Sequence, residues 1–150
     1  MRVRDLLDES VVKVGLESVN KRECIEELID LLARSGRISD RAAALNAVLK
    51  REATGSTGIG KGCAVPHGKH SSVAGIRMAL GTSSKGVDFD SLDGAPVHMV
   101  FLILAGAGEP GPHIRALAEV ARMMSIPGFY RRVVAAPSAG AVLDLFDAEE

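Results

Sequence analysis

A run of ten residues, VHMVFLILAG at 97–106, constrains the fold more than any other stretch of the sequence. It is apolar throughout except for His98. A continuous apolar run of this length is typical of a central β-strand that is buried on both of its faces. It is also well short of the roughly 20 residues that a membrane-spanning helix needs. We therefore expect a sheet with helices packed against both sides.

The rest of the sequence supplies further strands and the helices to cover them. The segment 11–16 is rich in valine, 76–83 alternates apolar and small or polar residues, and 62–67 is a short strand candidate. Apolar residues recur at helical spacing after Asn20, and Gly36 stands where that helix should end. Further helices are predicted from Ser39 or Asp40 to about Arg51, from Pro112 onward, and over 128–136 and 138–146.

This order of strands and helices predicts an α/β fold, in which a mixed β-sheet is flanked by helices on both faces in a sandwich. The chain has 150 residues and no repeat, low-complexity linker or break in composition. We therefore expect a single domain over residues 1–150.

Charge and composition exclude several classes of function. The net charge is −1, and the chain has one Tyr, four Phe and no Trp, so neither a basic surface nor stacking platforms for nucleic acid are expected. Charged residues occupy the N-terminal segment where a signal peptide needs an apolar core. The two cysteines form no disulfide framework. We expect a cytoplasmic protein that does not insert into a membrane.

The candidate site lies in the stretch TGSTGIGKGCAVPHGKH at 54–70, which holds five glycines and ends around His67. A neutral imidazole is a good nucleophile near pH 7, and histidine forms covalent intermediates. If the transferred group is a phosphoryl, its oxygens need hydrogen-bond donors, which Ser56, Thr57 and the flexible glycine backbone, Gly68 included, can supply. The alternative is a solvent-facing loop histidine beside a turn.

Two further residues are candidates for the same site. His113 lies in the first turn of a predicted helix, on the inward-leaning face with Leu117 and Val120, and its neutral ring can donate a hydrogen bond to a phosphoryl oxygen. The alternative is a histidine bonded to the backbone. Arg51 can bind phosphoryl oxygens through its planar guanidinium, or it can simply complement the negative C-terminal end of its helix.

A metal or nucleotide site is disfavoured. Cys63, His67 and His70 have the spacing C-x3-H-x2-H, but the second pair of ligands that a closed zinc site requires is missing. No G-x-x-x-x-G-K-[ST] motif for nucleotide phosphates is present. His98 lies within the buried strand and is predicted to be a core or edge residue. No cofactor is expected.

The segment REATGSTGIGKGCAVPHGK (51–69) resembles the phosphorylation-site segment of enzyme IIA domains of the bacterial phosphoenolpyruvate-dependent sugar phosphotransferase system. The class is the fructose/mannitol one, which includes the nitrogen-regulatory IIA proteins. The resemblance extends over nearly the whole chain, through the segments 28–40, 86–106, 113–124 and 129–147.

The resemblance implies that His67 is the phosphoacceptor, that His113 is the second active-site histidine and that Arg51 is the site arginine. It implies a single α/β domain that receives its phosphoryl group from an HPr-type carrier protein. Two outputs are compatible with it. A nitrogen-regulatory IIA protein would signal by docking to target proteins, and the free-standing chain leans toward this role. A sugar-specific IIA protein would pass the phosphoryl group to an enzyme IIB for fructose- or mannitol-type uptake.

Overall fold

The computed structural model describes residues 1–108 and 110–150, and within 110–112 it describes the backbone alone. After two short 3-10 turns, Val3–Leu6 and Glu9–Val11, the described residues form a mixed α/β fold. The helices are α1 (Lys21–Arg34), α2 (Arg41–Ala53), α3 (Pro110–Met124), α4 (Phe129–Ala135) and α5 (Ala139–Glu149). The strands are β1 (Val12–Val14), β2 (Gly58–Gly60), β3 (Cys63–Ala64), β4 (His67–Lys69), β5 (Ile76–Val87) and β6 (Val97–Ala105).

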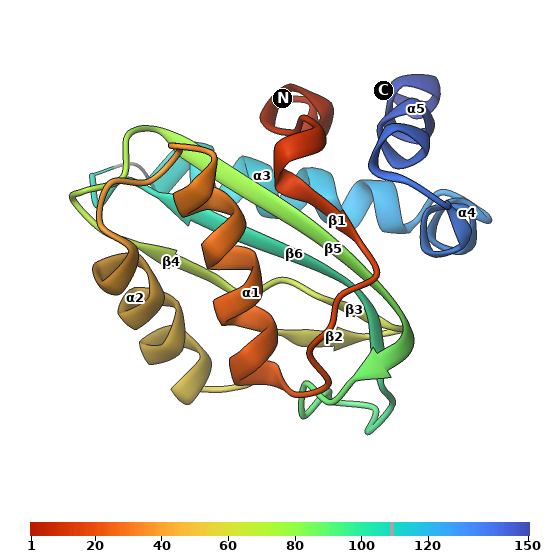
Figure 1. The fold of residues 1–150 in the computed structure, drawn as a ribbon, viewed down its shortest axis with the longest axis horizontal. Helices are drawn as coiled ribbons and strands as arrows, with labels where there is room; N and C mark the ends of the chain where they lie inside the picture. The colour runs from red at the N-terminus through yellow and green to blue at the C-terminus, as the bar shows by residue number, and fades with distance from the viewer. Residues whose placement is uncertain (109) are drawn as a thin grey trace.

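The six strands form one mixed sheet, which confirms the predicted fold class. Its order is β1-β5-β6-β3-β2. β3 and β4 pair with successive parts of the same edge of β6, β3 at residues 99–100 and β4 at residues 103–105. The long antiparallel pair β5–β6 lies at the centre (Figure 1). β1 runs parallel to β5, β3 and β4 run parallel to β6, and β2 is antiparallel to β3. All residues of β6 are buried except His98, which is half-buried, so the apolar run does form the central strand.

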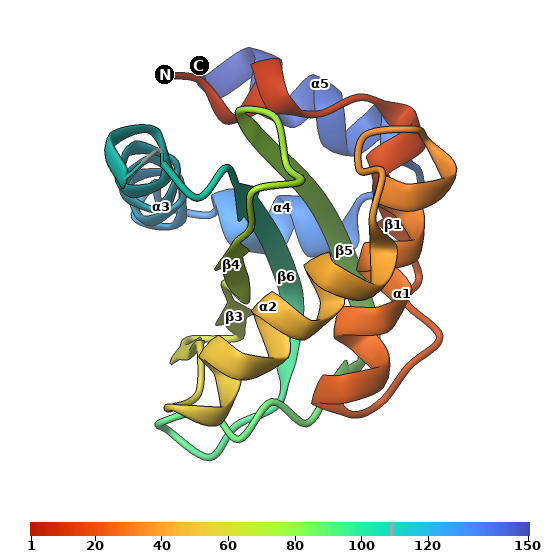
Figure 2. The same ribbon diagram turned by 90° about the vertical axis from the view of Figure 1, so that its left-hand side faces the viewer.

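Helices cover both faces of this sheet. α1 and α2 lie on one face, where α1 contacts β5 and α2 contacts β4. α3 and α4 contact β6 from the other face, and α5 packs beside the N-terminal segment (Figures 1 and 2). β4 therefore lies at an edge of the sheet between α2 on one side and α3 on the other. This position brings three distant parts of the sequence to one place.

The first two helices begin at N-cap residues that were predicted from the sequence. The Asn20 side chain accepts a hydrogen bond from the Glu23 backbone N–H, and Asp40, rather than Ser39, does the same for Ala43. These caps satisfy N–H groups that have no partner inside the helix. α2 runs to Ala53, two residues beyond the predicted end, so that Arg51 lies in its last turn.

Several predicted strand boundaries were wrong. The strand expected over 11–16 is limited to β1, and β5 extends four residues beyond 83. The strand expected over 62–67 is two strands, β3 and β4, so His67 opens a strand instead of ending one. β2, within the glycine-rich loop, was missed. Short strands like these are defined by pairing with distant partners, which a local pattern does not encode.

The C-terminal helices lie where they were predicted, but α5 runs to Glu149, three residues beyond its predicted end, and α3 starts early. This helix begins at Pro110, two residues before the predicted start, so the loop expected over 106–112 is shorter than predicted. One residue of that loop, Glu109, lies outside the described residues. No helix in the described part of the chain is long and apolar enough to span a membrane.

Candidate functional site

His67 is held by the strand that it opens. β4 pairs with β6 in parallel, with His67 opposite Ile103, and the backbone N–H of Ile103 donates to the Pro66 carbonyl at 3.0 Å. These contacts fix the backbone on both sides of the ring. The side chain is half-buried at the sheet edge, so it is positioned by the fold and remains accessible.

The His67 ring has a defined tautomer. Its Nδ1 lies 2.8 Å from the carbonyl oxygen of Val65. A carbonyl can only accept, so Nδ1 carries the proton and donates it, and in the neutral ring Nε2 keeps its lone pair. Burial lowers the pKa of His67, and the nearby Arg51 charge lowers it further, although the Val65 bond acts in the opposite sense. The ring is therefore neutral near pH 7, with Nε2 as its nucleophilic atom.

His113 faces His67 from the other side of the site. The two ring centroids are 5.0 Å apart, with the ring planes tilted by 53°. His113 is 7% exposed and lies in the first turns of α3, in line with the prediction of an inward-facing residue. Burial, with smaller contributions from His67 and Lys69, lowers its pKa to about 4. Its ring is therefore neutral near pH 7.

The Nε2 atom of His113 is buried and has no hydrogen-bond partner among the described residues. Leaving a buried polar atom unsatisfied costs on the order of 1–3 kcal/mol. Such atoms cluster where a ligand completes the bonding. A group that bound beside His67 would supply the missing partner.

Arg51 borders the same hollow from the end of α2. Its Nη1 donates to the Gly55 carbonyl at 2.9 Å and to the Thr54 hydroxyl at 3.2 Å. Within the described residues its Nε and Nη2 make no hydrogen bond, so these donors remain available. The guanidinium is thus anchored by the glycine-rich loop and still offers N–H groups to an anion.

The hollow itself has a volume of about 270 Å³ and is lined by Ala47, Arg51, His67, Gly68, Lys69 and His113. Lys69 was not singled out in the sequence analysis. Alternate residues of a strand share a face, so its position two residues after His67 could have indicated it. With two neutral imidazoles, a guanidinium and an ammonium, the hollow is suited to an anion.

Gly68 is required by packing. A Cβ atom at this position would lie 3.0 Å from the backbone of Ala47 and Val48 in α2. This is tighter than nearly all real Cβ contacts, so a side chain here would push β4 and α2 apart by a few tenths of an ångström. This contact sets the distance between His67 on β4 and Arg51 on α2.

The structure does not bring Ser56 and Thr57 into the hollow. The Ser56 hydroxyl donates to the Phe89 carbonyl at 2.6 Å and accepts from the Gly58 N–H. Thr57 is 3% exposed, and both its backbone N–H and its hydroxyl donate to the Glu52 carboxylate. These hydroxyls hold the loop in shape, so the predicted role in supporting phosphate is not supported by their contacts.

Glu52 is a site-supporting residue that sequence reasoning missed. Its carboxylate is almost fully buried, accepts from Thr57 and lies 3.4 Å from Lys21 Nζ. Glu52 and Arg51 are consecutive residues and bind opposite ends of the loop 54–57. The pair clamps the loop between them, so the last turn of α2 holds the loop in place.

The remaining histidines have other roles. His98 Nδ1 lies 2.7 Å from the Ser83 carbonyl, consistent with the predicted core or edge histidine. His70 Nδ1 lies within 3.0 Å of both the hydroxyl and the N–H of Ser72. No group of three or more His, Cys, Asp or Glu side chains that could hold a metal occurs in the described part of the chain.

Fold and site together define a class: an α/β protein with a nucleophilic imidazole and a second neutral imidazole in a cationic hollow at a sheet edge. The family profile described as "Phosphoenolpyruvate-dependent sugar phosphotransferase system, EIIA 2" matches residues 5–149. The chain belongs to this family, as its sequence resemblance indicated.

Both branches of the family are represented among its relatives. The chain is 37% identical, over 98% of its length, to the fructose-specific EIIABC component of Bacillus subtilis, of which it spans only 23%. It is 32% identical to a nitrogen regulatory protein of Bradyrhizobium diazoefficiens, covering 95% of this chain and 92% of that one. The crystal structure of the nitrogen regulatory protein IIA-Ntr from Neisseria meningitidis has a TM-score of 0.88 at 29% identity, covering 96% of this chain and 98% of that one.

Proposed function

We propose that the protein is a cytoplasmic phosphoryl carrier, a single IIA domain over residues 1–150, and that His67 accepts the group on Nε2 from an HPr-type protein. The observation that carries this proposal is the hydrogen bond from Nδ1 to the Val65 carbonyl. It leaves Nε2 as the only ring nitrogen with a free lone pair.

In the transfer step, the lone pair of Nε2 attacks phosphorus. The N–P bond of the donor's phosphohistidine breaks, and its electron pair returns to the donor ring, which leaves as a neutral imidazole. The His67 ring becomes a phosphoimidazolium that keeps its proton on Nδ1. The Val65 carbonyl then accepts a charge-assisted hydrogen bond, which is stronger than the neutral one.

The other residues of the hollow stabilise the transferred group. Charge spreads over three phosphoryl oxygens during transfer, and catalysis depends on positioning and electrostatic stabilisation. Arg51 offers free N–H donors to these oxygens, and Lys69 adds a second positive charge. His113, as the neutral tautomer that carries its proton on Nε2, donates one hydrogen bond. No metal or nucleotide takes part in this scheme.

The exposed surface beside the site suits transient protein docking. Ile114 follows His113 directly and is 63% exposed. Exposed apolar side chains beside a reactive group are a common element of protein interfaces. We expect a donor carrier to bind over this surface with its phosphohistidine directed at His67.

We propose that the output is regulatory, through docking to target proteins with the phosphoryl group as a charge switch. The nitrogen regulatory relatives, which match over nearly their whole length, support this output. A second candidate is transfer to an enzyme IIB for fructose- or mannitol-type uptake. It is favoured by the higher identity to the fructose-specific relative.

The test combines the purified protein with phosphoenolpyruvate, enzyme I and an HPr-type carrier. Intact mass and phosphorus NMR should show an acid-labile gain of one phosphoryl group in the wild type and in the control variant His70→Ala, and none in His67→Ala. NMR of ¹⁵N-histidine-labelled protein should place the phosphoryl on Nε2. Phosphorylation on Nδ1, or persistence of the gain in His67→Ala, contradicts the proposal.

The two outputs can then be separated with the phosphorylated protein. Rapid passage of the phosphoryl group to a purified fructose- or mannitol-type enzyme IIB would establish sugar transport and overturn the regulatory proposal. Retention of the group in the presence of each IIB would support the regulatory one.

A further inference from the structure

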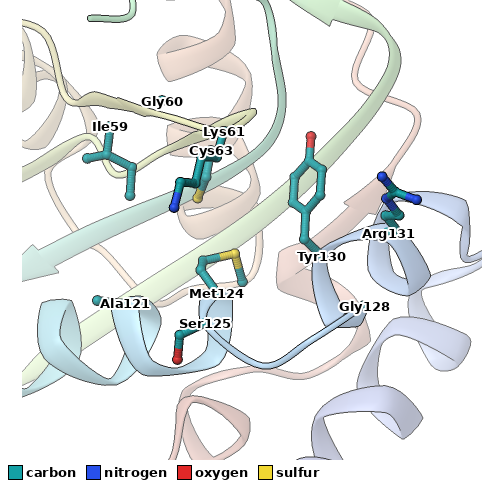
Figure 3. A pocket seen from close by; sticks show the side chains of 10 residues that line it. All are labelled: Ile59, Gly60, Lys61, Cys63, Ala121, Met124, Ser125, Gly128, Tyr130 and Arg131. Atoms are coloured by element: carbon teal, nitrogen blue, oxygen red, sulfur yellow. The ribbon is translucent and has the colours of Figure 1, made fainter. Parts of the chain in front are cut away.

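A further cavity lies away from His67, at the far end of α3. Its volume is about 460 Å³, within the range of small-molecule sites. Three elements form it: the β2–β3 hairpin, the last turn of α3 and the start of α4 (Figure 3). His113 and Met124 are eleven residues apart on α3, so the cavity is about 16 Å from the second histidine along the helix axis.

The body of the cavity is apolar. Ile59, Cys63, Met124 and Tyr130 line it, and Figure 3 shows the Met124 side chain and the Tyr130 ring between the hairpin and α4. Burial raises the pKa of the Cys63 thiol to about 12 and also raises that of Tyr130. Both groups are therefore uncharged near pH 7, and the walls carry no negative charge.

The charges at the cavity are both positive. Lys61 and Arg131 line it from opposite sides, and both are exposed. Neither makes a salt bridge with any described residue. The carboxylate of Asp93 accepts from the backbone N–H groups of Lys61 and Ala95, but Asp93 is not among the lining residues. An apolar cavity that is lined by two cations and by no carboxylate is complementary to an amphipathic anion.

The cavity wall is built into the fold. Tyr130 donates a hydrogen bond to the Gly62 carbonyl at 3.3 Å, and a Cβ atom on Gly62 would lie 2.0 Å from the Tyr130 oxygen. Gly62 has a φ of +81°, which favours glycine. The ring thus packs against a backbone that only glycine leaves open, which fixes this wall of the cavity.

We propose that this cavity binds a small organic anion, with an apolar body between the hairpin and α4 and a carboxylate or similar group between Lys61 and Arg131. This site is separate from the phosphoryl-transfer hollow, and the proposal does not depend on phosphorylation of His67. It gives the protein a second input, through a small molecule.

The test uses three probes that separate the two parts of the proposed ligand. 4-Phenylbutyrate carries both the apolar body and the charge, 4-phenylbutyramide carries the body alone, and inorganic phosphate carries the charge alone. Each is titrated into ¹⁵N-labelled full-length protein and followed by amide chemical shifts. For a ligand of this size we expect the phenylbutyrate dissociation constant to be on the order of 1 mM.

Phenylbutyrate should shift the amides of residues 59–63, 121–125 and 128–131 and leave those of β4 unchanged. The amide probe should bind about tenfold more weakly, since a charged hydrogen bond is lost. Phosphate should produce no saturable shift at this cavity. Equal binding of the acid and the amide would overturn the anion assignment, and shifts centred on His67 would overturn the location.

Two variants test the residues named. Lys61→Gln/Arg131→Gln should weaken phenylbutyrate binding about tenfold or more. A matched control, Arg34→Gln/Lys50→Gln, removes the same charge from α1 and α2 and should leave binding unchanged. Ala121→Phe places a ring in the cavity and should abolish binding while both charges remain. Wild-type affinity in either cavity variant, with a native amide spectrum, overturns the proposal.

Discussion

The two hollows at opposite ends of α3 differ in size and in the side chains that line them. The hollow at the start of α3 is small and contains four titratable or cationic side chains, with one ring oriented by a backbone carbonyl. The cavity at the end is larger and mostly apolar, and its two cations lie on the rim. The first hollow is suited to stabilising a reacting group. The second is suited to binding a ligand without reacting with it.

The difference shows that one helix can serve two purposes when its ends meet different parts of the sheet. At its start, α3 lies beside β4, an edge strand that Gly68 brings close to α2. At its end, it lies beside the β2–β3 hairpin, which Tyr130 holds through Gly62. Mutations at one end should therefore affect phosphoryl transfer, and mutations at the other should affect stability and ligand binding only.

The largest effect is expected for a substitution of His113. It tests whether the first hollow has a catalytic role that the second lacks. His113→Ala removes a donor directed at the transferring group, so the rate of phosphoryl transfer to His67 should fall by about 10²–10³-fold. Rapid-quench kinetics with the phosphorylated carrier measures this rate. His113→Gln, which keeps an N–H donor, should recover part of it. An unchanged rate in His113→Ala would reduce His113 to a packing residue.

The second prediction concerns the pH dependence of stability. The pKa of His113 is about 4 in the folded protein, below the ordinary histidine value of about 6.5 in the unfolded chain. Below pH 6.5 the unfolded state binds more protons, so the free energy of unfolding should fall as the pH drops from 6.5 through 4. The loss attributable to His113 should approach about 2–3 kcal/mol.

Urea unfolding at several pH values checks this prediction. His113→Gln, which cannot titrate, should lose less stability than the wild type between pH 6.5 and 4. Parallel curves for the two proteins would show that His113 is not held neutral by burial. His67 contributes in the same direction, because burial also lowers its pKa.

Part of the first hollow could be predicted from the sequence, because its residues belong to patterns that are visible in short segments of the chain. Arg51 and His67 belong to one continuous motif, and the helix that carries His113 has a clear apolar periodicity. The role of the Ser56 and Thr57 hydroxyls could not be predicted. The partner of Ser56 is the Phe89 carbonyl, 33 residues away in the sequence. Thr57 is bound by Glu52, whose burial depends on the packing of α2 against the sheet.

The second cavity could not be predicted at all. Its walls come from three segments that look ordinary when each is considered alone. In the sequence, Lys61 and Arg131 look like ordinary surface cations. Met123 and Met124 are adjacent, yet Met123 is buried in the core and Met124 lines the cavity. Only the three-dimensional pairing of the hairpin with α3 and α4 reveals a site there.

A third prediction tests the loop clamp beside the first hollow. Glu52→Gln replaces a buried carboxylate that accepts two hydrogen bonds from Thr57, and its amide group would face a donor. We expect a loss of about 1–3 kcal/mol in the free energy of unfolding. We also expect slower phosphoryl transfer, since Arg51 is anchored to the same loop. Chemical denaturation and transfer kinetics measure both.

The control for the clamp is Glu23→Gln, which changes an exposed carboxylate on α1 and should alter stability by less than about 0.5 kcal/mol. If Glu52→Gln lowered stability and left the transfer rate at the wild-type value, the loop would be a structural element alone.

The smallest effect is expected at the second cavity. It tests whether the two ends of α3 function independently of each other. Gly62→Ala places a Cβ atom against the Tyr130 hydroxyl and forces alanine into a left-handed conformation, which should cost about 1–2 kcal/mol. Tyr130→Phe removes the obstructing oxygen together with a single 3.3 Å hydrogen bond, and should cost only about 0.5–1 kcal/mol. The double variant removes the 2.0 Å contact with the hydroxyl oxygen and keeps only the 2.7 Å contact with the ring carbon Cζ. Gly62→Ala/Tyr130→Phe should therefore lose less stability than the two single losses combined. All three variants should transfer phosphoryl to His67 at the wild-type rate, since neither residue contacts the first hollow. A slowed transfer in these variants would show that the two ends of α3 act as one unit, and the division of the molecule into a reacting end and a binding end would then be wrong.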